Sequence, residues 1–293
     1  MATLRELRGR ISGVKKTQKI TKAMKMVAAA KLRRAQANMI QARPYAAKIK
    51  ALLQHLSLGT DMTQNSLFQV RPVNAVAVVV VTADRGFCGA FNNNLVKAAE
   101  KHILTSHKPL LDQGKVKIFA VGKKGFDYFN KRGYSLAGKY IGVYNNLIFS
   151  EAQTIVRDVL SGYEKGEYDQ VEIISNEFKS VAQSKISLEQ FLPIAPLAFD
   201  STQHKSVDYI YEPSPADILK ALVPKHLNFV VWKVLLESNA SEQGARMAAM
   251  ENATTNANEL INTLQLSYNK ARQASITSEL LEIVGGAEAL QKG

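Results

Sequence analysis

The fold is decided by residues 247–271, which read MAAMENATTNANELINTLQLSYNKA. Apolar or small side chains recur there at alternating intervals of three and four residues: Met247, Met250, Thr254, Ala257, Ile261, Leu264, Tyr268 and Ala271. Such a heptad seam is typical of a helix that pairs with another helix. Between Pro224 and Val284 there is no further proline and a single glycine, Gly244. The pattern therefore predicts one helix of about 60 residues, roughly 90 Å long.

The start of this helix is expected at Pro224, because a proline inside a helix removes a hydrogen bond and breaks or kinks it. A shorter helix is predicted just before it. Ser214 suits the N-cap of that helix, Pro215 its first position and Asp217 its positively polarised end.

The partner of the long helix is expected at the other end of the chain. Residues 4–58 are rich in good helix formers and contain one proline, Pro44. Apolar side chains recur at Leu4, Leu7, Ile11 and Val14. The seam then meets three polar residues, Gln18, Thr21 and Lys25, and the apolar face is predicted to slip to Ile20, Met24 and Val27. With a globular domain between them, the two terminal helices must lie antiparallel.

The middle of the chain has a different texture. Residues 75–81 form an unbroken, mostly β-branched run, typical of a strand buried on both faces. Further strands are predicted at 116–121 and 171–174, with helices at 92–104, where Asn92 is the expected cap, 124–131 and 151–163. Residues 178–188 suggest a hairpin arm or an edge strand. This alternation predicts an α/β fold with a mostly parallel, doubly wound, Rossmann-like sheet. The predicted division is 1–58, a shaft helix; 74–208, the α/β domain; and 209–293, a shaft helix paired with 1–58.

The excess positive charge is confined to one segment. The chain carries a formal net charge of +13, and residues 1–50 hold 14 Lys or Arg against one acidic residue, Glu6. Arg8, Lys15, Lys19 and Lys22 fall on one helix face, as in a nucleic-acid-binding helix, although no aromatic residue precedes Tyr45. A membrane-surface helix would carry Trp, Phe or Leu opposite the lysines, whereas Ala and Met dominate here. An acidic protein partner and a merely solvated face are the other interpretations.

Sites for chemistry are scarce in the sequence. Asp84-Arg-Gly-Phe-Cys-Gly-Ala-Phe-Asn92 follows a strand, where α/β folds bind phosphate, but its glycines do not match GxGxxG or a P-loop. A tight turn or a partner-facing patch is the better interpretation. The single cysteine, Cys88, excludes an internal disulfide, and the histidines, among them His102 and His107, lack metal-ligand spacing and are expected at the surface. We predict no catalytic residues, no metal and no cofactor.

Four blocks closely resemble the gamma subunit of F-type ATP synthase. They are residues 18–31 (QKITKAMKMVAAAK), 84–89 (DRGFCG), 241–250 (SEQGARMAAM) and 268–280 (YNKARQASITSEL), and the resemblance extends over the whole chain. It implies a non-catalytic rotor stalk whose terminal helices turn inside a hexamer of alpha and beta subunits. Epsilon and a membrane ring of c subunits are the other implied partners, and nucleic acid is not one. Proton-driven rotation of the ring would then be coupled to ATP synthesis or hydrolysis at the beta subunits.

The resemblance also implies roles for particular residues. Lys22, Met24 and Lys25 match the block that passes the acidic lever loops of beta. Arg272, Gln273 and Thr277 match residues that hydrogen-bond to a catch loop on beta, which we call the latch residues. Asp84, Arg85 and Cys88 are expected in a partner-facing turn, and Glu242 and Arg246 near the base of the shaft.

The chain lacks the insertion and the cysteine pair of the chloroplast proteins, so thiol switching is not expected. Without a transit peptide, it is expected to be bacterial and peripheral on the cytoplasmic side of the cell membrane. Two rival hypotheses stay open from the residues alone: a basic coiled-coil nucleic-acid binder, and a small α/β enzyme that uses the Asp84 turn.

Overall fold

The computed structural model describes residues 3–59, 65–180, 183–195, 211–212 and 214–291. Packing divides the chain into two units, residues 1–28 with 247–293 and residues 29–246. Two long helices contribute to both units: α1, Leu4–Gly59, and α6, Pro215–Gln291. None of the described helices is long and apolar enough to cross a membrane. The three-part division predicted from sequence stays a prediction, and its boundary at 208–209 lies outside the described residues.

The first unit is a pair of helices whose contacts follow the predicted seam of α6. Met250, Ala257 and Ile261 are buried, and the other seam residues are half-buried. Two cross-helix contacts give the direction of pairing: Arg8 with Tyr268, and Lys25 with Glu251. Residue numbers rise along α1 as they fall along α6. The two helices are therefore antiparallel, as predicted.

The predicted slip of the apolar face on α1 is wrong. Ile20 and Val27 are 59% and 56% exposed. The heptad positions are kept instead by Gln18, Thr21 and Lys25, which contact α6. Polar residues remain in the seam because α6 offers each of them a polar partner at the same level, so none has to be buried without a hydrogen bond or ion pair.

The second unit contains a five-stranded sheet. The strands are β1 (Val76–Val81), β2 (Val116–Val121), β3 (Leu136–Tyr140), β4 (Gln170–Phe178) and β5 (Ser184–Leu192). Their order is β3-β2-β1-β4-β5, with the first four parallel and β5 antiparallel at one edge. The mostly parallel sheet and its edge strand are confirmed. The sequence reasoning missed β3, whose five residues, LAGKY, lack the β-branched side chains that mark strands.

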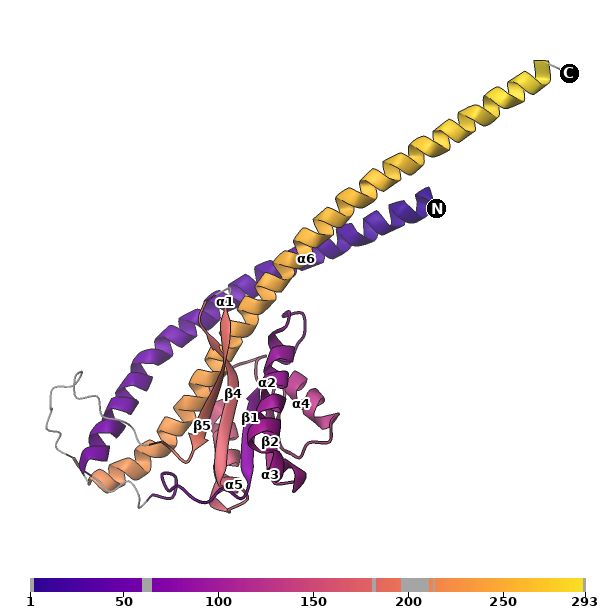
Figure 1. Cartoon of the computed structure of the whole chain (residues 1–293). Coiled ribbons are helices and arrows are strands. Elements are labelled where there is room, and N and C mark those ends of the chain that lie inside the picture. Colours follow the sequence, from indigo (N-terminus) through magenta and orange to yellow (C-terminus); the bar gives the residue numbers. More distant parts are fainter. Residues whose placement is uncertain (1–2, 60–64, 181–182, 196–210, 213, 292–293) are drawn as a thin grey trace. The chain divides into compact units, whose positions relative to one another are not determined.

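Both faces of this sheet are covered, which explains the unbroken apolar run of β1 (Figure 1). Val76, Val78 and Val80 pack with α2 (Phe91–Ser106) and α4 (Lys123–Asn130). The alternate residues of β1 pack with α5 (Phe149–Glu164) and with the parts of α1 and α6 that belong to this unit. A short helix, α3 (Lys108–Asp112), follows α2. Full burial of one valine side chain contributes roughly 1.5–3 kcal/mol, so β1 is a large part of the core.

The prediction that the long helix begins at Pro224 is wrong. Helix α6 begins at Pro215, where the backbone N–H of Asp217 donates to Oγ of Ser214 at 3.1 Å, and it continues through Pro224. Leu219, Val223 and Leu227 are all buried in the same core. Burial on both sides of the proline holds the helix in place and offsets the ~3 kcal/mol that an interior proline costs.

Candidate functional site

The helix pair of the first unit is joined by polar contacts. Going from the inner end outwards they are Lys25 with Glu251, Thr21 with Thr254, Gln18 with Asn258, and Arg8 with Tyr268. The two threonine hydroxyl oxygens lie 2.8 Å apart, and each is also within hydrogen-bond distance of a backbone carbonyl of its own helix. One hydroxyl therefore donates to the other threonine, and the second donates to its own carbonyl. The guanidinium of Arg8 donates to the Tyr268 hydroxyl at 2.8 Å. These pairs fix which residues of α1 and α6 lie at the same level.

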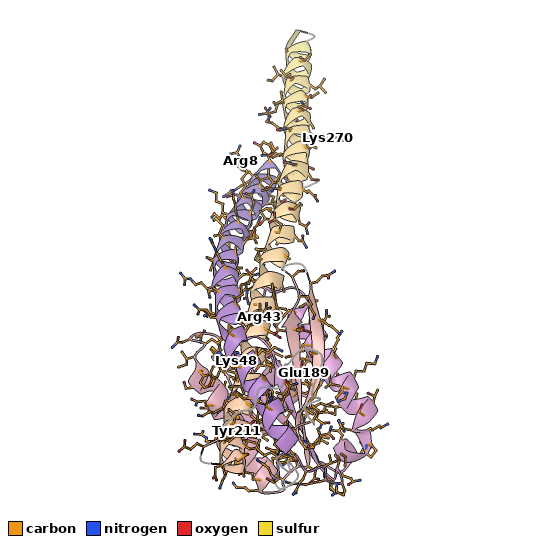
Figure 2. All side chains as sticks on the ribbon, turned by 90° about the vertical axis from the view of Figure 1, so that its left-hand side faces the viewer. Arg8, Arg43, Lys48, Glu189, Tyr211 and Lys270 are labelled. Atoms are coloured by element: carbon orange, nitrogen blue, oxygen red, sulfur yellow. The ribbon has the colours of Figure 1, made fainter. Side chains whose placement is uncertain are left out.

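The residues matched to the beta lever loops differ in exposure. Lys22 is exposed, whereas Met24 is half-buried. Lys25 is also half-buried and forms the ion pair with Glu251, so part of its charge is used inside the chain. Much of the positive charge of α1 faces solvent: Arg8, Lys15, Lys19, Lys22, Arg43 and Lys48 are all exposed, and Arg8, Arg43 and Lys48 are labelled in Figure 2.

The latch residues lie on α6 at the level where α1 begins and beyond it. Arg8 contacts Tyr268 and α1 begins only four residues earlier, at Leu4. Arg272, Gln273 and Thr277 are all exposed, and the Thr277 hydroxyl donates to the backbone carbonyl of Gln273 at 3.0 Å.

The same part of α6 carries large apolar side chains that are also exposed. They are Ile276, Leu280, Leu281, Ile283 and Val284, between 49% and 67% exposed. We call residues 272–284 the tip of α6. Sequence reasoning did not single out these apolar residues, although the spacing of Ile276, Leu280 and Ile283 is helical.

The turn between β1 and α2 is held by side chains that point back into the domain. The Oδ1 atom of Asp84 accepts hydrogen bonds from the backbone N–H groups of Lys123 and Gly142, both at 3.0 Å. The amide of Asn92 accepts from the N–H of Ala83 at 2.9 Å and donates to Sγ of Cys88 at 3.1 Å. Asn92 therefore braces the turn rather than capping α2, which corrects its predicted role.

This turn is bound to α6 through a buried ion pair. Nη1 of Arg246 lies 2.6 Å from Oε1 of Glu242, and Nη2 donates to the carbonyl of Gly86 at 3.1 Å. Burial raises the pKa of Glu242, and Arg246 counteracts part of the increase. Glu242 Oε2 and Asp84 Oδ2 are both buried without a hydrogen bond among the described residues. Glu242 and Arg246, which the sequence singled out only weakly, thus connect the turn to the long helix.

The expectation that the turn presents Cys88 to a partner is corrected by the structure. Cys88 is 1% exposed, and burial raises the pKa of its thiol. The Asp84 carboxylate is likewise engaged by the backbone. Arg85 and Phe87 are exposed, as are Gly89 and Ala90 later in the turn, and Phe87 has a positive φ of 61°. A buried, protonated thiol is a poor nucleophile, which weighs against the enzyme hypothesis.

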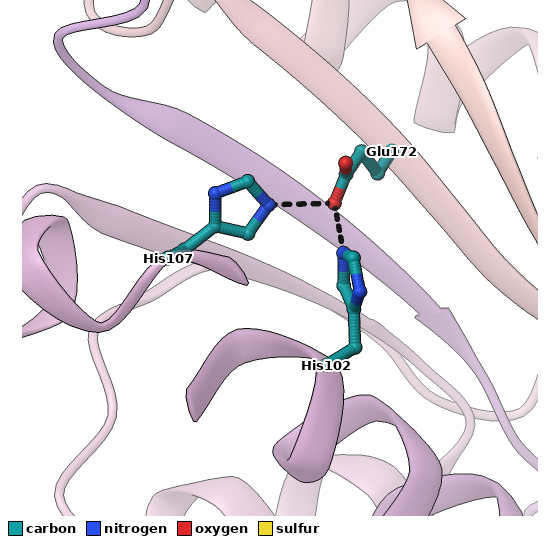
Figure 3. A group of neighbouring side chains, drawn as sticks. All are labelled: His102, His107 and Glu172. Carbon is teal, nitrogen blue, oxygen red and sulfur yellow. Dashed lines mark hydrogen bonds and ion pairs between the residues drawn. The ribbon is translucent and has the colours of Figure 1, made fainter. Parts of the chain in front are cut away.

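Two histidines expected at the surface are instead largely enclosed. His102 on α2 and His107, between α2 and α3, both direct Nε2 at one oxygen of Glu172 on β4 (Figure 3). The side chains are 18%, 10% and 9% exposed, respectively. The only sequence signal was an acidic residue inside an otherwise apolar strand, Val171-Glu-Ile-Ile174.

Comparison with known proteins gives consistent matches over the whole length. A family model described as ATP synthase matches residues 3–290. The ATP synthase gamma chain of Prosthecochloris aestuarii is 54% identical over 292 residues, covering 99% of both chains. That of Chlorobaculum tepidum is 53% identical over 293 residues, covering 100% of both.

The chain belongs to the ATP synthase gamma-chain family. Like other gamma chains, it is a subunit of the ATP synthase complex, which is associated with a membrane.

Solved structures agree with this fold. A chain of the Euglena gracilis mitochondrial ATP synthase, solved as OSCP/F1/c-ring in rotational state 3, has a TM-score of 0.70 over 99% of this chain and 95% of its own. At 23% identity it shows the fold alone. A chain from the central stalk and c-ring of the Tetrahymena thermophila enzyme is 26% identical, with a TM-score of 0.60 over 80% of this chain and 99% of its own. The predicted resemblance to gamma chains and the predicted fold class are thereby confirmed.

Proposed function

We propose that this gamma chain is the rotating central stalk of a bacterial ATP synthase, with its terminal helices inside a ring of alpha and beta subunits. The observation that carries the proposal is the tip of α6. Five large apolar side chains are about half or more exposed there, beside the exposed latch residues. Exposed apolar surface of this kind marks a protein-binding site. The sleeve formed by the alpha and beta subunits is the partner that the family implies.

The exposed lysines of α1 would face acidic lever loops on the beta subunits. Lys15, Lys19 and Lys22 have long, flexible side chains, and all three are exposed. Lysine interacts with a carboxylate as a mobile point charge rather than through a rigid bidentate fork. Such contacts attract an acidic loop without fixing one geometry, which suits a surface that moves past three beta subunits in turn.

The latch residues would make a more directional contact. Arg272 can donate several charge-assisted hydrogen bonds to a loop on beta, and the Gln273 amide can donate and accept. The Thr277 hydroxyl already donates to the Gln273 carbonyl, which leaves its oxygen as an acceptor. In this proposal each angle of the stalk favours one combination of beta conformations, which is a coupling free energy between rotation and nucleotide affinity.

The remaining contacts follow from the same proposal. The α/β domain would bind epsilon and the ring of c subunits, so the chain is peripheral to the membrane on the cytoplasmic side. ATP chemistry would take place at the beta subunits, and this chain would contribute no catalytic group. The burial of Cys88, with its raised thiol pKa, supports the non-catalytic role.

Reconstitution tests this function. The alpha and beta subunits of the same organism are co-expressed with and without this chain, and ATP hydrolysis by the purified hexamer is measured. We expect sustained turnover, and stepwise rotation of a bead attached to the α/β domain, only when the chain is present. A hexamer that is equally active without the chain, or that does not retain it on purification, would contradict the proposal.

A further inference from the structure

His102, His107 and Glu172 bring three possible metal-ligand atoms close together. Oε2 of Glu172 lies 2.7 Å from Nε2 of His102 and 3.0 Å from Nε2 of His107. One candidate ligand atom from each residue can be chosen so that all lie within 4.8 Å of one another. The two imidazole rings are nearly perpendicular, with centroids 5.2 Å apart. Two nitrogens and one oxygen thus converge on one small volume (Figure 3).

The protein orients these groups from behind. Nε2 of Gln170 donates to the other oxygen of Glu172 at 3.0 Å, so Oε2 is the one left for the histidines. Oγ of Ser106 lies 3.4 Å from Nδ1 of His102, on the far side of that ring. Ligating histidines usually have their second nitrogen bound to a hydrogen-bonding group in this way, and that contact fixes the ring orientation.

The backbone places a carboxylate where an apolar residue would ordinarily pack. On β4, Val171 and Ile173 face one core of the sheet, and Ile174 faces the other, together with α2. Glu172 shares its face with Ile174, under the end of α2. The pairing of β4 with β5 shifts register between Val171 and Glu172. Such irregularities re-aim side chains and are found next to functional sites.

We propose that His102, His107 and Glu172 bind one divalent transition-metal ion, Zn²⁺ being the ion that best fits the donor set. In a tetrahedral site with ligand bonds of 2.0–2.2 Å, neighbouring ligand atoms lie about 3.3 Å apart. The Glu172 oxygen lies 2.7 Å from Nε2 of His102 and 3.0 Å from Nε2 of His107, so these separations would lengthen by about 0.6 and about 0.3 Å on metal binding. Mg²⁺ and Ca²⁺ are disfavoured because they take oxygen ligands. A water molecule would complete the fourth position.

The protons balance without an external reagent. In the metal-free chain, a neutral histidine that donates to Glu172 carries its proton on Nε2. Metal binding needs that nitrogen's lone pair, so the proton moves through solvent to Nδ1, where His102 can donate it to Oγ of Ser106. A neutral ring therefore releases no net proton, whereas a protonated ring releases one to solvent.

The consequence for the protein is a cross-link inside the α/β domain. His102 is near the end of α2, His107 lies between α2 and α3, and Glu172 is on a central strand. A bound ion would tie the loop after α2 to the sheet and stabilise the native state in proportion to its occupancy. The site lies apart from the latch residues and the lysines of α1 in the sequence, and its test does not depend on rotation.

Metal binding is measured directly on the full chain after removal of metal with a chelator. Zn²⁺ is titrated in competition with a chromophoric chelator, for wild type and for His107→Gln and Glu172→Gln. His226→Gln, which keeps all three residues of the cluster, is the matched control. We expect one ion per chain in wild type and in the control, and affinity at least about tenfold weaker in the other two variants. Zn²⁺ should raise the thermal midpoint of wild type but not of His107→Gln.

A second measurement uses wild type alone, so it is independent of how the variants fold. Co²⁺ in a four-coordinate site absorbs visible light much more strongly than hydrated, six-coordinate Co²⁺. Strong absorption that saturates at one equivalent and is bleached by Zn²⁺ would support the proposal. Absorption like that of the hydrated ion, or Zn²⁺ affinity unchanged by His107→Gln in a folded chain, would overturn it.

Discussion

Glu242 and Arg246 lie one helical turn apart and show what a single buried charge does in this chain. Their ion pair is almost enclosed, with side chains 6% and 12% exposed, and it binds the turn after β1 through the carbonyl of Gly86. Removing one partner of a buried pair leaves the other charge uncompensated, which is more costly than the pair is worth. The pair therefore fixes how the turn packs on α6.

The raised pKa of Glu242 gives a pH dependence with a definite sign. Burial raises the pKa above its usual 4.5, so the folded chain binds this proton more tightly than the unfolded chain. The stability linked to Glu242 is present below pH 4.5 and is lost as pH rises through the folded-state pKa. Glu242→Gln removes this titration.

We therefore expect the stability of Glu242→Gln minus that of wild type to increase as pH rises from 4.5 towards neutrality, and then to level off. The measurement is the midpoint of urea unfolding of the full chain at a series of pH values. The attraction between ionised Glu242 and Arg246 is already included in the pKa of Glu242, which stays raised, so it does not change this sign. A difference that decreases with pH would contradict the raised pKa.

Some side-chain contacts could be placed from the sequence, and others could not. The cap at Ser214 follows from local chemistry alone and is confirmed. Asn92 has the same kind of side chain, but its partners, Ala83 and Cys88, are set by how the turn folds back. The meeting of His102 and His107 with Glu172 depends on the sheet order, because Glu172 is more than sixty residues away in sequence.

At the level of elements, the helix pair shows which contacts the spacing of apolar residues predicts and which it misses. The seam of α6 was correctly predicted because every apolar or small residue in it obeys the 3-4 spacing. On α1 the same spacing continues through Gln18, Thr21 and Lys25, but these residues are polar, so a search for apolar residues does not assign them to the seam. Only the partner helix makes those residues acceptable in a seam. Pro224 is similar, because core packing around it outweighs its local preference.

We expect the seam to contain small residues because the two helices leave little space between them. Ala257 is 7% exposed, so Ala257→Leu should overpack the pair and destabilise it by about 1–3 kcal/mol. Asn256→Leu, at the adjacent exposed position, is the matched control and should change stability by less than about 0.5 kcal/mol. Thermal unfolding followed by far-UV circular dichroism measures both. Equal effects of the two variants would mean that the seam is not tightly packed.

At the level of the whole molecule, the fold class and the family could be predicted from the sequence. The surfaces proposed to contact other subunits could be predicted only in part. The long blocks of matching residues, such as 268–280, identify the family without any structure. Which part of α6 extends past α1 depends on the pairing between Arg8 and Tyr268, and that pairing comes only from the structure. The latch itself stays a prediction.

Variants of the latch test its role in the assembled complex. Arg272→Ala with Gln273→Ala should lower ATP turnover by roughly ten- to hundredfold, since a charge-assisted hydrogen bond contributes ~1.5–3 kcal/mol. Assembly with alpha and beta should be retained, because the apolar side chains of the tip are unchanged. Asn262→Ala, also exposed on α6, is the control and should turn over like wild type. Wild-type turnover in the double variant would remove the latch from the proposal.

The polar pairs between α1 and α6 have a mechanical consequence. If one helix slid along the other by a heptad, Thr21 would face Ile261 or Met247 in place of Thr254, and Lys25 would lose Glu251. An all-apolar seam would tolerate such sliding more easily, since one leucine contact resembles the next. The polar pairs therefore lock the register of the two helices, as splines lock a shaft to its hub. A helix pair held in register in this way can transmit a torque applied at one end without one helix sliding along the other.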